Sequence, residues 1–566
     1  MNNMYDVLEV GTFQQAQLLS YQPEVVRIRT NGFLLDGDGG AAFYDRWTDV
    51  INPLPVNGRG IWWFEAFDTS CWQIAAAAQH NAQQFGALGG VEIDAAPILN
   101  AAFAASMVRQ IQIGALTHYF TPEIVVPSGK GLRGISRTLS WMKVIPLADE
   151  ETQTTPRFAI VHRDDSDGFS EDYSIDCQRS GLGRGDDNRT HGLCIIATAD
   201  GACEGTRIRR VDVHNAWGYA HYTVVTVGGS ASLQNVAHED CRCFNFQVGF
   251  ETTGYVSASW SRDTTAYGDP VDGGLKVPVE ALYHEYGAIQ SFTRFNAVGR
   301  GTGGAGILIY TTDNVDIEQI TYRAPDIFID TLGGTAMVVE GRTGNRVNRF
   351  VIDGGSVIGA DMGAVFRFGQ MVVRNTNIVG LDGNGLEIGT GATVDLHAPM
   401  IEANRDANGP VAAVAVPINT IEQIRWYGDG RVAANGPITS YSIDKTLVRF
   451  FGTPEITPFG PPIPPVPGSI LRERMFRIPR TDWIVSGTQD FQVRINLTAS
   501  PNDRVADIQK AHLIPTLEFP FPNGGVYNPT VSFGTLWIDP TQVRIYVKSD
   551  QPLTGWVLKA RLTEYA

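Results

Sequence analysis

The chain has 566 residues, more than a typical single domain, so it should hold several domains or one repeat architecture. Charged residues make up only 18% of it and glycines number 61, a composition that favours short strands joined by tight turns over a helical protein. The formal net charge of −16 and the pI near 5.1 argue against nucleic acid or an anionic membrane as a partner.

Neither membrane insertion nor export by a signal peptide is predicted. No apolar run approaches the roughly 18 to 20 residues that span a bilayer, and the N-terminal residues lack a basic stretch followed by an apolar one. The six cysteines are too few for a disulfide framework, and we expect them to be reduced and mostly buried. A metal site at Cys241, Cys243 and His238 is the weaker interpretation, because a spacing of one residue suits alternate strand residues in a core better than zinc. No metal and no cofactor are predicted.

Residues 1–50 are predicted to form a small head segment. The stretch GDGGAAFYDRW, from Gly37 to Trp47, places three glycines before alternating aromatic residues. This pattern predicts a turn with positive φ angles followed by a strand. A phosphate-binding loop is disfavoured, because neither a Lys-Ser/Thr pair nor a helical pattern follows.

Residues 51–150 are predicted to be the entry region of a larger structure. From Asn81 to Gln110 an alanine-rich apolar pattern has the helical period, which predicts one amphipathic helix. From Thr121 to Ile135 the alternation predicts a strand, a turn at residues 127–129 and a second strand.

Residues 151–452 carry an internal repeat. Strand-like anchors recur at intervals of 25, 25, 31, 28, 30, 23 and 21 residues, at Val211, Val236, Ser261, Phe292, Ile320, Phe350, Val373 and Val394. A glycine that precedes alternating apolar residues recurs in phase, at Gly249, Gly306, Gly334, Gly363 and Gly385. A coil of roughly 20 to 30 residues cannot bury its apolar face alone, so successive coils must stack. The predicted fold is therefore all-β, a solenoid of parallel strands.

Two further segments follow the repeat. The proline-rich residues 453–468 predict an extended linker. Residues 469–566 contain several alternating strands and predict a compact antiparallel β-sandwich, which we expect to trimerise the chain, to bind carbohydrate, or both. Its Trp483, Trp537 and Trp556 could stack on sugars, although core packing is the simpler use of at least two of them.

Three motifs resemble those of bacteriophage tailspikes and receptor-binding proteins of the pectate-lyase-like right-handed β-helix class. Residues 37–46 are similar to the head motif GDGGGAxYxR of that class. Residues 85–102 are similar to FGAxGDGxxDDTxAIxxA, with the acidic run reduced to Glu92 and Asp94, and residues 126–134 are similar to the cap PxGxYxLxG. The order and spacing of the three match, and the resemblance covers about residues 25–420.

The resemblance implies a right-handed parallel β-helix and a homotrimer in the phage tail. It implies attachment through the N-terminus to tail, baseplate or adaptor proteins, after synthesis in the host cytoplasm. It also implies recognition and depolymerisation of a host surface polysaccharide, either capsule, exopolysaccharide or O-antigen.

Ionisable residues are densest between His214 and Glu285. Coils of 25 residues would stack His214 on Glu239 and Asn215 on Asp240. Acids on neighbouring coils would lie about 5 Å apart, the spacing of a retaining glycosidase pair, and acids two coils apart would approach the inverting separation. When carboxylates crowd together, the pKa of one of them rises. One carboxyl group can then act as an acid and another as a base. We predict that the catalytic pair comes from Glu239, Asp240, Asp263, Asp269, Glu251 and Glu280.

Flat rings and polar side chains of the same region are predicted to bind the substrate. They are Trp217, His221, Tyr222, His238, Trp260, Arg262, Tyr267 and His284. A second-ranked site is the glycine-rich loop from Asp176 to Gly192, with Asp186, Asp187 and His191.

Several alternatives stay open. Stacked Asn, Asp and Thr residues often only satisfy the backbone of solenoid turns, and inward aromatics fill the core. A lyase would use a base such as Tyr267, His284 or Lys276 beside Arg262. A receptor-binding protein without activity would recognise the glycan in the same groove. A bacterial pectin-active enzyme is disfavoured by the missing signal peptide and the phage-like head motif.

Overall fold

The computed structural model describes most of the N-terminal 456 residues and the strands of the C-terminal part. The described ranges are 7–49, 54–146, 154–178, 190–198, 201–216, 218–225, 231–244, 246, 248–253, 256–257, 259–262, 265–268, 280–285, 289–293, 296–299, 305–310, 316–317, 319–329, 334–341, 346–404, 412–416, 423–434, 448–456, 470–479, 484–485, 490–496, 511–518, 531–539, 542–549 and 557–565.

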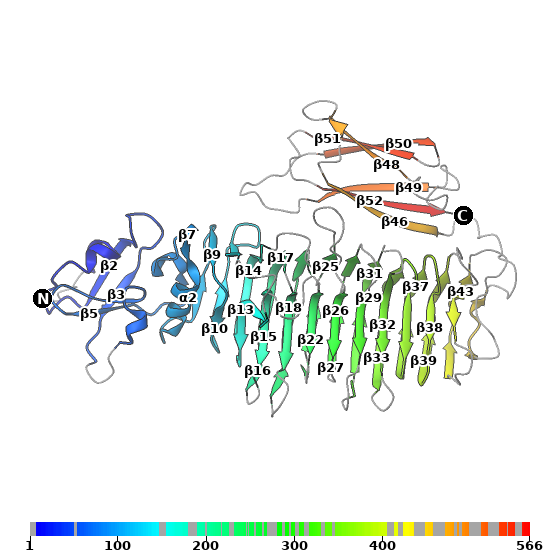
Figure 1. Cartoon of the computed structure of the whole chain (residues 1–566), viewed down its shortest axis with the longest axis horizontal. Helices are drawn as coiled ribbons and strands as arrows, with labels where there is room; N and C mark the ends of the chain where they lie inside the picture. Colours follow the sequence, from blue (N-terminus) through cyan, green and yellow to red (C-terminus); the bar gives the residue numbers. More distant parts are fainter. Residues whose placement is uncertain are drawn as a thin grey trace, which may run out of the picture.

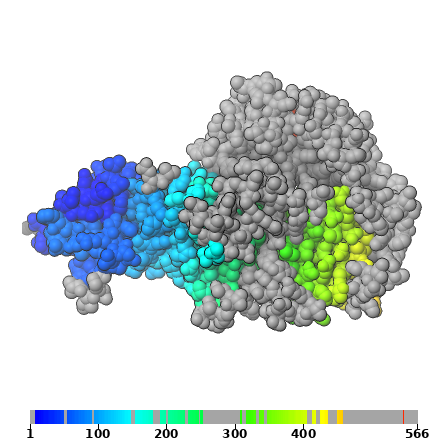
Figure 2. Space-filling model, viewed as in Figure 1, coloured from blue at the N-terminus to red at the C-terminus, as the bar shows by residue number. Residues whose placement is uncertain are grey.

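The head is a small sheet at the N-terminal end of the molecule (Figures 1 and 2). Its strands, in spatial order, are β1 (Leu8–Thr12), β2 (Arg27–Gly32), β3 (Phe43–Arg46), β5 (Cys71–Ile74) and β4 (Trp63–Glu65), with the helices α1 (Phe13–Ala16) and η1 (Val56–Gly58). Phe13, Tyr44 and Phe64 pack together in its core.

The predicted turn before β3 is confirmed, and a carboxylate holds it. Asp38 accepts hydrogen bonds from the backbone N–H groups of Phe33, Leu34, Leu35 and Gly40. Burial disfavours its charged form, but these four donors outweigh that effect and lower the pKa of Asp38. The head motif therefore has a structural use in this chain.

The predicted helix over residues 81–110 is wrong in extent. The segment forms η2 (Ala82–Phe85), β7 (Gly90–Asp94) and the ten-residue α2 (Ala95–Ala104). Gly86, Gly89 and Gly90 all have positive φ angles, which end one element and start the next, and Asp94 caps α2 through the N–H of Ala96. The strand–turn–strand prediction that follows is confirmed by β10 (Ile124–Val126) and β11 (Gly131–Arg133).

The solenoid is built from two long parallel sheets, which confirms the predicted right-handed parallel β-helix (Figure 1). The eleven-stranded sheet takes one strand from each of eleven successive coils. In spatial order these are β10 (Ile124–Val126), β13 (Arg157–Arg163), β15 (Thr190–Ala197), β18 (Tyr219–Val225), β22 (Val248–Thr253), β26 (Glu280–Glu285), β29 (Ala305–Tyr310), β32 (Thr335–Glu340), β35 (Ala364–Arg367), β38 (Leu386–Ile388) and β41 (Val414–Ala415).

The twenty-six-stranded sheet is bent, and most coils supply two of its strands. The strands of its first leg are β6 (His80–Asn81), β8 (Gln110–Gln112), β11 (Gly131–Arg133), β14 (Phe169–Asp176), β17 (Arg207–His214), β20 (Ala237–Glu239), β24 (Ser259–Arg262), β27 (Ile289–Thr293), β30 (Gln319–Arg323), β33 (Val347–Asp353), β36 (Gly369–Arg374), β39 (Ala392–His397), β42 (Gln423–Tyr427) and β44 (Val448–Phe451). Its second leg holds β7, β9 (Thr117–Phe120), β12 (Trp141–Val144), β21 (Arg242–Phe244), β25 (Thr265–Gly268), β28 (Asn296–Gly299), β31 (Asp326–Ile329), β34 (Ser356–Gly359), β37 (Asn377–Gly380), β40 (Met400–Ala403), β43 (Arg431–Ala434) and β45 (Glu455–Ile456), and the long β14 and β17 run through both legs.

A single residue with positive φ makes the bend between the legs in several coils, as in Asp172, Arg210, Asp240, Ala324 and Asn375. A three-stranded parallel ribbon lies beside the early coils, with β16 (Ala202–Glu204), β19 (Ser232–Gln234) and β23 (Val256–Ser257). The last coil reaches Ile456, inside the segment expected to be a linker.

Two antiparallel sheets form the C-terminal part, drawn as two layers in Figure 1. One holds β46 (Ile470–Pro479), β52 (Val557–Tyr565) and β49 (Ala511–Glu518). The other holds β47 (Ile484–Val485), β48 (Asp490–Asn496), β51 (Gln542–Ser549) and β50 (Val531–Asp539). Trp537 lies in β50, whereas Trp483 and Trp556 lie outside the described residues.

The glycine marker follows from how closely the coils approach. Gly306, Ala336, Gly363 and Gly385 occupy one position in successive strands of the eleven-stranded sheet. A Cβ on Gly363 would lie 2.5 Å from the carbonyl oxygen of Gly385, closer than two such atoms can approach. Glycine is therefore required at position 363, while the column as a whole holds only glycine and alanine.

The register corrects the predicted 25-residue coils. The coil advances 30 residues from Arg209 to Glu239, its partner, and 23 from Glu239 to Arg262. His214 pairs with Phe244, so the predicted stacks of His214 on Glu239 and of Asn215 on Asp240 are wrong. The reason is that the loops between strands differ in length from coil to coil, whereas the strands keep one register.

All six cysteines are free, and five of them are buried. Within the described ranges, no three His, Cys, Asp or Glu side chains are arranged to hold a metal ion. The helices of the same ranges are all too short or too polar to cross a membrane.

Candidate functional site

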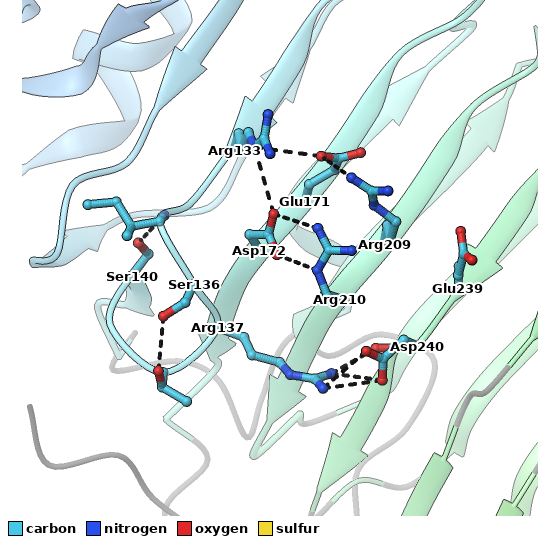
Figure 3. A network of polar contacts seen from close by, with 12 residues as sticks. Arg133, Ser136, Arg137, Ser140, Glu171, Asp172, Arg209, Arg210, Glu239 and Asp240 are labelled. Atoms are coloured by element: carbon cyan, nitrogen blue, oxygen red, sulfur yellow. Dashed lines mark hydrogen bonds and ion pairs between the residues drawn. The ribbon is translucent and has the colours of Figure 1, made fainter. Parts of the chain in front are cut away.

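An ionic ladder covers the outer face of the first leg at the N-terminal end of the solenoid (Figure 3). Arg133, Glu171, Arg209, Glu239 and Arg262 occupy the same position in five successive strands. Positive and negative residues therefore alternate from coil to coil. Stacked opposite charges stabilise neighbouring strands, which is a structural use of acids.

Distances within the ladder show how its acids are partnered. Glu171 Oε2 lies 3.1 Å from Arg209 and 3.7 Å from Arg133. Asp172, at the bend, forms two hydrogen bonds with Arg210, of 2.5 and 2.8 Å. Each of these two carboxylates is thus held by the guanidinium of the following coil.

Arg137 forms ion pairs with coils that are far from it in the sequence. It reaches out of the loop after β11 and lies 3.2 Å from the carboxylate of Asp240 (Figure 3). It also lies 3.3 Å from the carboxylate of Asp212. Asp212 also forms an ion pair with Arg242. Of the predicted catalytic acids, Glu239 and Asp240 lie here. The carboxylate of Asp240 is paired with Arg137, and Glu239 lies in register between Arg209 and Arg262.

A ring cluster lies on the eleven-stranded sheet. The His191 ring stacks on Tyr219 at 4.7 Å and lies 5.1 Å from Tyr222 and 5.6 Å from Phe158. His191 Nδ1 accepts the backbone N–H of Tyr219, which fixes its tautomer with the proton on Nε2.

Glu251 is next to this ring cluster. It pairs in register with Tyr222, and Tyr222 packs against Val161, Cys194 and Ile196 on the outer face of the sheet. Glu251 is 5% exposed. The structure therefore brings together Tyr222 and Glu251 of the predicted site with His191 of the second-ranked site.

Two predicted substrate-binding histidines point into the solenoid, which corrects their assignment. The His221 ring stacks on the core residue Phe250 at 4.7 Å and lies 5.6 Å from His238. Burial lowers the pKa of His238 to about 4 and that of His221 well below its usual value. A polysaccharide cannot reach these rings, because alternate residues of a strand face opposite sides and these two take the inner one.

The other predicted residues divide into two groups. Trp260, Arg262, Tyr267, Glu280 and His284 lie in described strands, where their backbone positions are known. His284 shares its register position with Ile309 and Val339, both of which are buried in the core. Trp217, Asp263, Asp269, Lys276, Asp186 and Asp187 lie outside the described residues.

A hydrogen-bonded chain of Ser170, His162 and Asp165 has the composition of a catalytic triad. His162 Nε2 lies 2.8 Å from Ser170 Oγ, and Nδ1 lies 2.8 Å from Asp165 Oδ2. All three residues are fully buried, and Asp165 also accepts the N–H of Gly129 and the hydroxyl of Thr206. The chain joins three coils in the core, where no polymer can reach the serine.

A group of carboxylates in the C-terminal coils was not predicted. Asp361 follows β34 and Asp382 follows β37, one coil later, and the N–H of Asp382 bonds to the carbonyl of Ala360. Glu387, in β38, lies close by. Burial raises the pKa of Asp361, and the negative charges of Asp382 and Glu387 raise it further.

Among the residues that the structure describes, Arg367 bridges two acids of this group. Arg367 lies 3.4 Å from Glu340 and 3.3 Å from Glu387. Gly383 makes room for Asp361, because a Cβ there would lie 2.6 Å from Asp361 Oδ1. We name Asp361, Asp382, Glu387, Glu340 and Arg367 the acid group.

A sequence signal for the acid group was present. Gly359 and Gly380 are register partners, and each is followed by one residue and then an aspartate, in Gly-Ala-Asp361 and Gly-Leu-Asp382. A repeated Gly-x-Asp in adjacent coils places two carboxylates side by side. Only the true coil length reveals that the two triplets are neighbours.

Comparison with known proteins finds a likeness in shape but none in sequence. No family model matches the chain, and no curated protein matches it in sequence. Several solved structures resemble it in shape. Among them are phage tailspikes.

Three of the solved structures illustrate the range. The enzymatically active domain of tailspike protein 2 from bacteriophage CBA120 is 12% identical over 92% of this chain and 72% of that chain, with a TM-score of 0.48. The tailspike protein gp49 of the Acinetobacter baumannii bacteriophage Fri1, a capsular polysaccharide depolymerase, is 11% identical over 99% and 98%, with a TM-score of 0.41. The A-module of a mannuronan C-5 epimerase from Azotobacter vinelandii is 14% identical over 68% and 100%, with a TM-score of 0.43. At these identities and scores the likeness assigns neither activity nor substrate to this chain.

The acid group has the chemistry that glycoside hydrolysis requires. Hydrolysis uses one carboxyl group that is protonated and one that is ionised, and carboxylates about 5 Å apart suit a retaining mechanism. Asp361 and Asp382 stand on adjacent coils, whose backbones are about 4.8 Å apart. Asp361, with its raised pKa, is suited to the acid role, and Asp382 to the base or nucleophile.

Proposed function

We propose that this chain is a phage tailspike that binds and cleaves a polysaccharide on the surface of its host. The observation that supports this best is the acid group on a long parallel solenoid, because a linear polymer can lie along successive coils while two carboxyl groups act on one glycosidic bond. Capsule, exopolysaccharide and O-antigen all offer such bonds. The proposal includes a homotrimer attached to tail, baseplate or adaptor proteins through its N-terminus.

Hydrolysis is the proposed reaction. Asp361 would donate a proton to the leaving oxygen, and Asp382 would attack the anomeric carbon or activate a water. The raised pKa of Asp361 supports its part as the acid. The acids Glu239, Asp240, Glu251, Glu280, Asp263 and Asp269 remain the competing set, with the ring cluster and Trp217, Trp260, Arg262, Tyr267 and His284 as candidate sugar contacts.

The deciding experiment incubates the purified chain with a panel of bacterial capsular, exopolysaccharide and O-antigen preparations. Chain length, reducing ends and absorbance at 235 nm (unsaturated uronates absorb near that wavelength) are followed together. We expect shortening with new reducing ends and no gain in absorbance. A rise in absorbance would instead establish a lyase.

Variants then locate the site. Asp361→Asn and Asp382→Asn should abolish cleavage without loss of binding, and Glu239→Gln and Asp240→Asn serve as the comparison. Loss of cleavage in the second pair alone would move the active site to the ionic ladder.

The second candidate function is a receptor-binding protein without activity. Tyr222 and Phe158, the two rings of the ring cluster that are not fully buried, favour it, because an aromatic face can bind a sugar without any chemistry. Binding to a polysaccharide that stays intact would support this function and overturn the enzyme.

A further inference from the structure

A stack of three rings stands at the C-terminal end of the solenoid, far along the chain from the ring cluster. His397, Tyr427 and Phe451 occupy one outward position in β39, β42 and β44. The centroids of the first two rings are 4.6 Å apart and those of the last two 5.0 Å, with interplanar angles of 11° in both pairs. We name these three residues the ring stack.

The last ring of the stack is open to solvent. β44 pairs only with β42 among the described strands, so no further strand of the sheet follows Phe451. Phe451 is 60% exposed, whereas His397 and Tyr427 are half-buried. The two rings beneath hold Phe451 in place, and no ring of the described residues stacks on its other flat face.

Charged residues beside the ring stack add a preference for anions. Asp395, Arg425 and Arg449 form the neighbouring outward column on the same strands. Arg425 is bound by Asp395 through hydrogen bonds of 2.5 and 2.9 Å. Arg449 is exposed and has no ion-pair partner among the described residues, although it lies directly opposite Arg425.

Two arginines opposite each other on one sheet face repel, and one aspartate neutralises only one of them. An anion bound at Arg449 removes that imbalance, and a guanidinium pairs well with a carboxylate through two parallel hydrogen bonds. Phe451 lies two residues from Arg449 on the same strand, and the face of a sugar ring packs against an aromatic face. Phe451 and Arg449 together therefore suit a sugar that carries a carboxylate.

We propose that Phe451 and Arg449 form a binding subsite for an acidic sugar unit of the polysaccharide, with the sugar ring on Phe451 and its carboxylate on Arg449. This inference rests on the proposed function, because it concerns the same polymer. The subsite lies several coils beyond the acid group, so it holds the chain on the surface and takes no part in bond cleavage.

The test measures binding of a polysaccharide that the wild-type chain binds in the panel described above, before and after chemical reduction of its carboxyl groups. We expect Phe451→Ala and Arg449→Gln each to weaken binding about tenfold. Phe451→Trp should keep the affinity, and reduction of the carboxyl groups should weaken wild-type binding but not that of Arg449→Gln.

Matched controls are Phe67→Ala, an exposed phenylalanine of the head, and Arg323→Gln, an exposed arginine lower in the column of the ring stack. Neither should change the affinity. Unchanged binding by Phe451→Ala overturns the subsite while the proposed function stands. A change in oligomeric mass in that variant also overturns it, because Phe451 would then be covered by another protein surface. Failure of the wild-type chain to bind any polysaccharide overturns the proposed function itself.

Discussion

The acidic side chains of the N-terminal coils of the solenoid have different partners from those of the C-terminal coils. In the ionic ladder, Glu171 and Asp172 each face an arginine on the following coil. In the acid group, Arg367 bridges Glu340 and Glu387 while Asp361 is left with a raised pKa. A carboxylate that is paired with an arginine of the next coil holds the two coils together. A carboxylate that lies among other negative charges has a raised pKa and is suited to carry a proton at the pH of a reaction.

The interiors of the two regions differ as well. The inward position that holds His238 in the early coils holds Ile352, Val373 and Leu396 in the later ones. Buried histidines must stay neutral, since burial disfavours their charged form. We therefore expect the stability of the early coils to depend on pH through these core histidines.

The largest expected effect separates the two sets of acids. Asp361→Asn should lower the rate of polysaccharide cleavage about 10³-fold, because an amide cannot donate the proton. Asp172→Asn, in the ionic ladder, is the matched control and should leave the rate within about twofold. The rate of formation of reducing ends at saturating substrate measures both. Equal rates in the two variants would remove the distinction between the regions.

Stability should respond to the same substitution in the opposite sense. The folded pKa of Asp361 lies above the unfolded value, so its contribution is most favourable at low pH and is lost as pH rises through the folded pKa. Asp361→Asn should therefore stabilise the fold near pH 7, by no more than about 1 kcal/mol. The gain should disappear near pH 4 in thermal unfolding.

Removal of Arg137 tests the ionic ladder directly. Arg137→Ala leaves Asp240 without its partner and Asp212 with Arg242 alone, and Asp212 is almost completely buried. We expect a loss of about 2 to 3 kcal/mol in the free energy of unfolding, measured in urea. The control is Arg27→Ala in the head, whose ion pair with Asp45 is exposed and should contribute less than about 1 kcal/mol. Similar losses in both variants would contradict the role assigned to Arg137.

The column that holds Gly306, Ala336, Gly363 and Gly385 should not accept a larger side chain at position 363. Gly363→Ala places a Cβ 2.5 Å from the carbonyl oxygen of Gly385, and the coils must move apart. We expect a loss of about 1 to 3 kcal/mol. Gly114→Ala is the control, because its nearest neighbour would be at 3.5 Å. A melting temperature unchanged by Gly363→Ala would show that the coils can adjust.

A further small effect is expected in the core of the early coils. The ring nitrogens of His118 have no hydrogen-bond partner in the described structure, and burial lowers the pKa of His118 to about 4. The unfolded chain binds that proton near pH 6.5, so stability falls as pH drops from about 6.5 to about 4. His118→Leu should stabilise the fold by about 1 kcal/mol and reduce this slope. Ile175→Leu, in the same inward column, should leave the slope unchanged.

Much of the architecture was predictable from the residues alone. The glycine marker at Gly306, Gly363 and Gly385, the turn at Asp38 and the strand-like anchors all report local conformation, which side-chain period and turn chemistry determine. Two predicted anchor pairs are register partners, Ser261 with Phe292 and Ile320 with Phe350. The other anchors are displaced, as where Phe292 pairs with Tyr322 in place of Ile320. The helix over residues 81–110 failed because alanine-rich apolar runs suit both helix and buried strand, and glycines with positive φ decided between them.

The candidate site depended on facts that no local pattern contains. The pairing of His214 with Phe244 and of Glu239 with Arg209 follows from loops whose added residues leave the alternation of the strands unchanged. A shift of one residue turns a side chain from the surface to the core, which is why His221 and His238 are inside and Tyr222 is outside. The sequence by itself determined that parallel coils stack. Only the tertiary structure decided which acids meet arginines and which meet other acids, because neighbours across coils are set by the summed length of every loop between them.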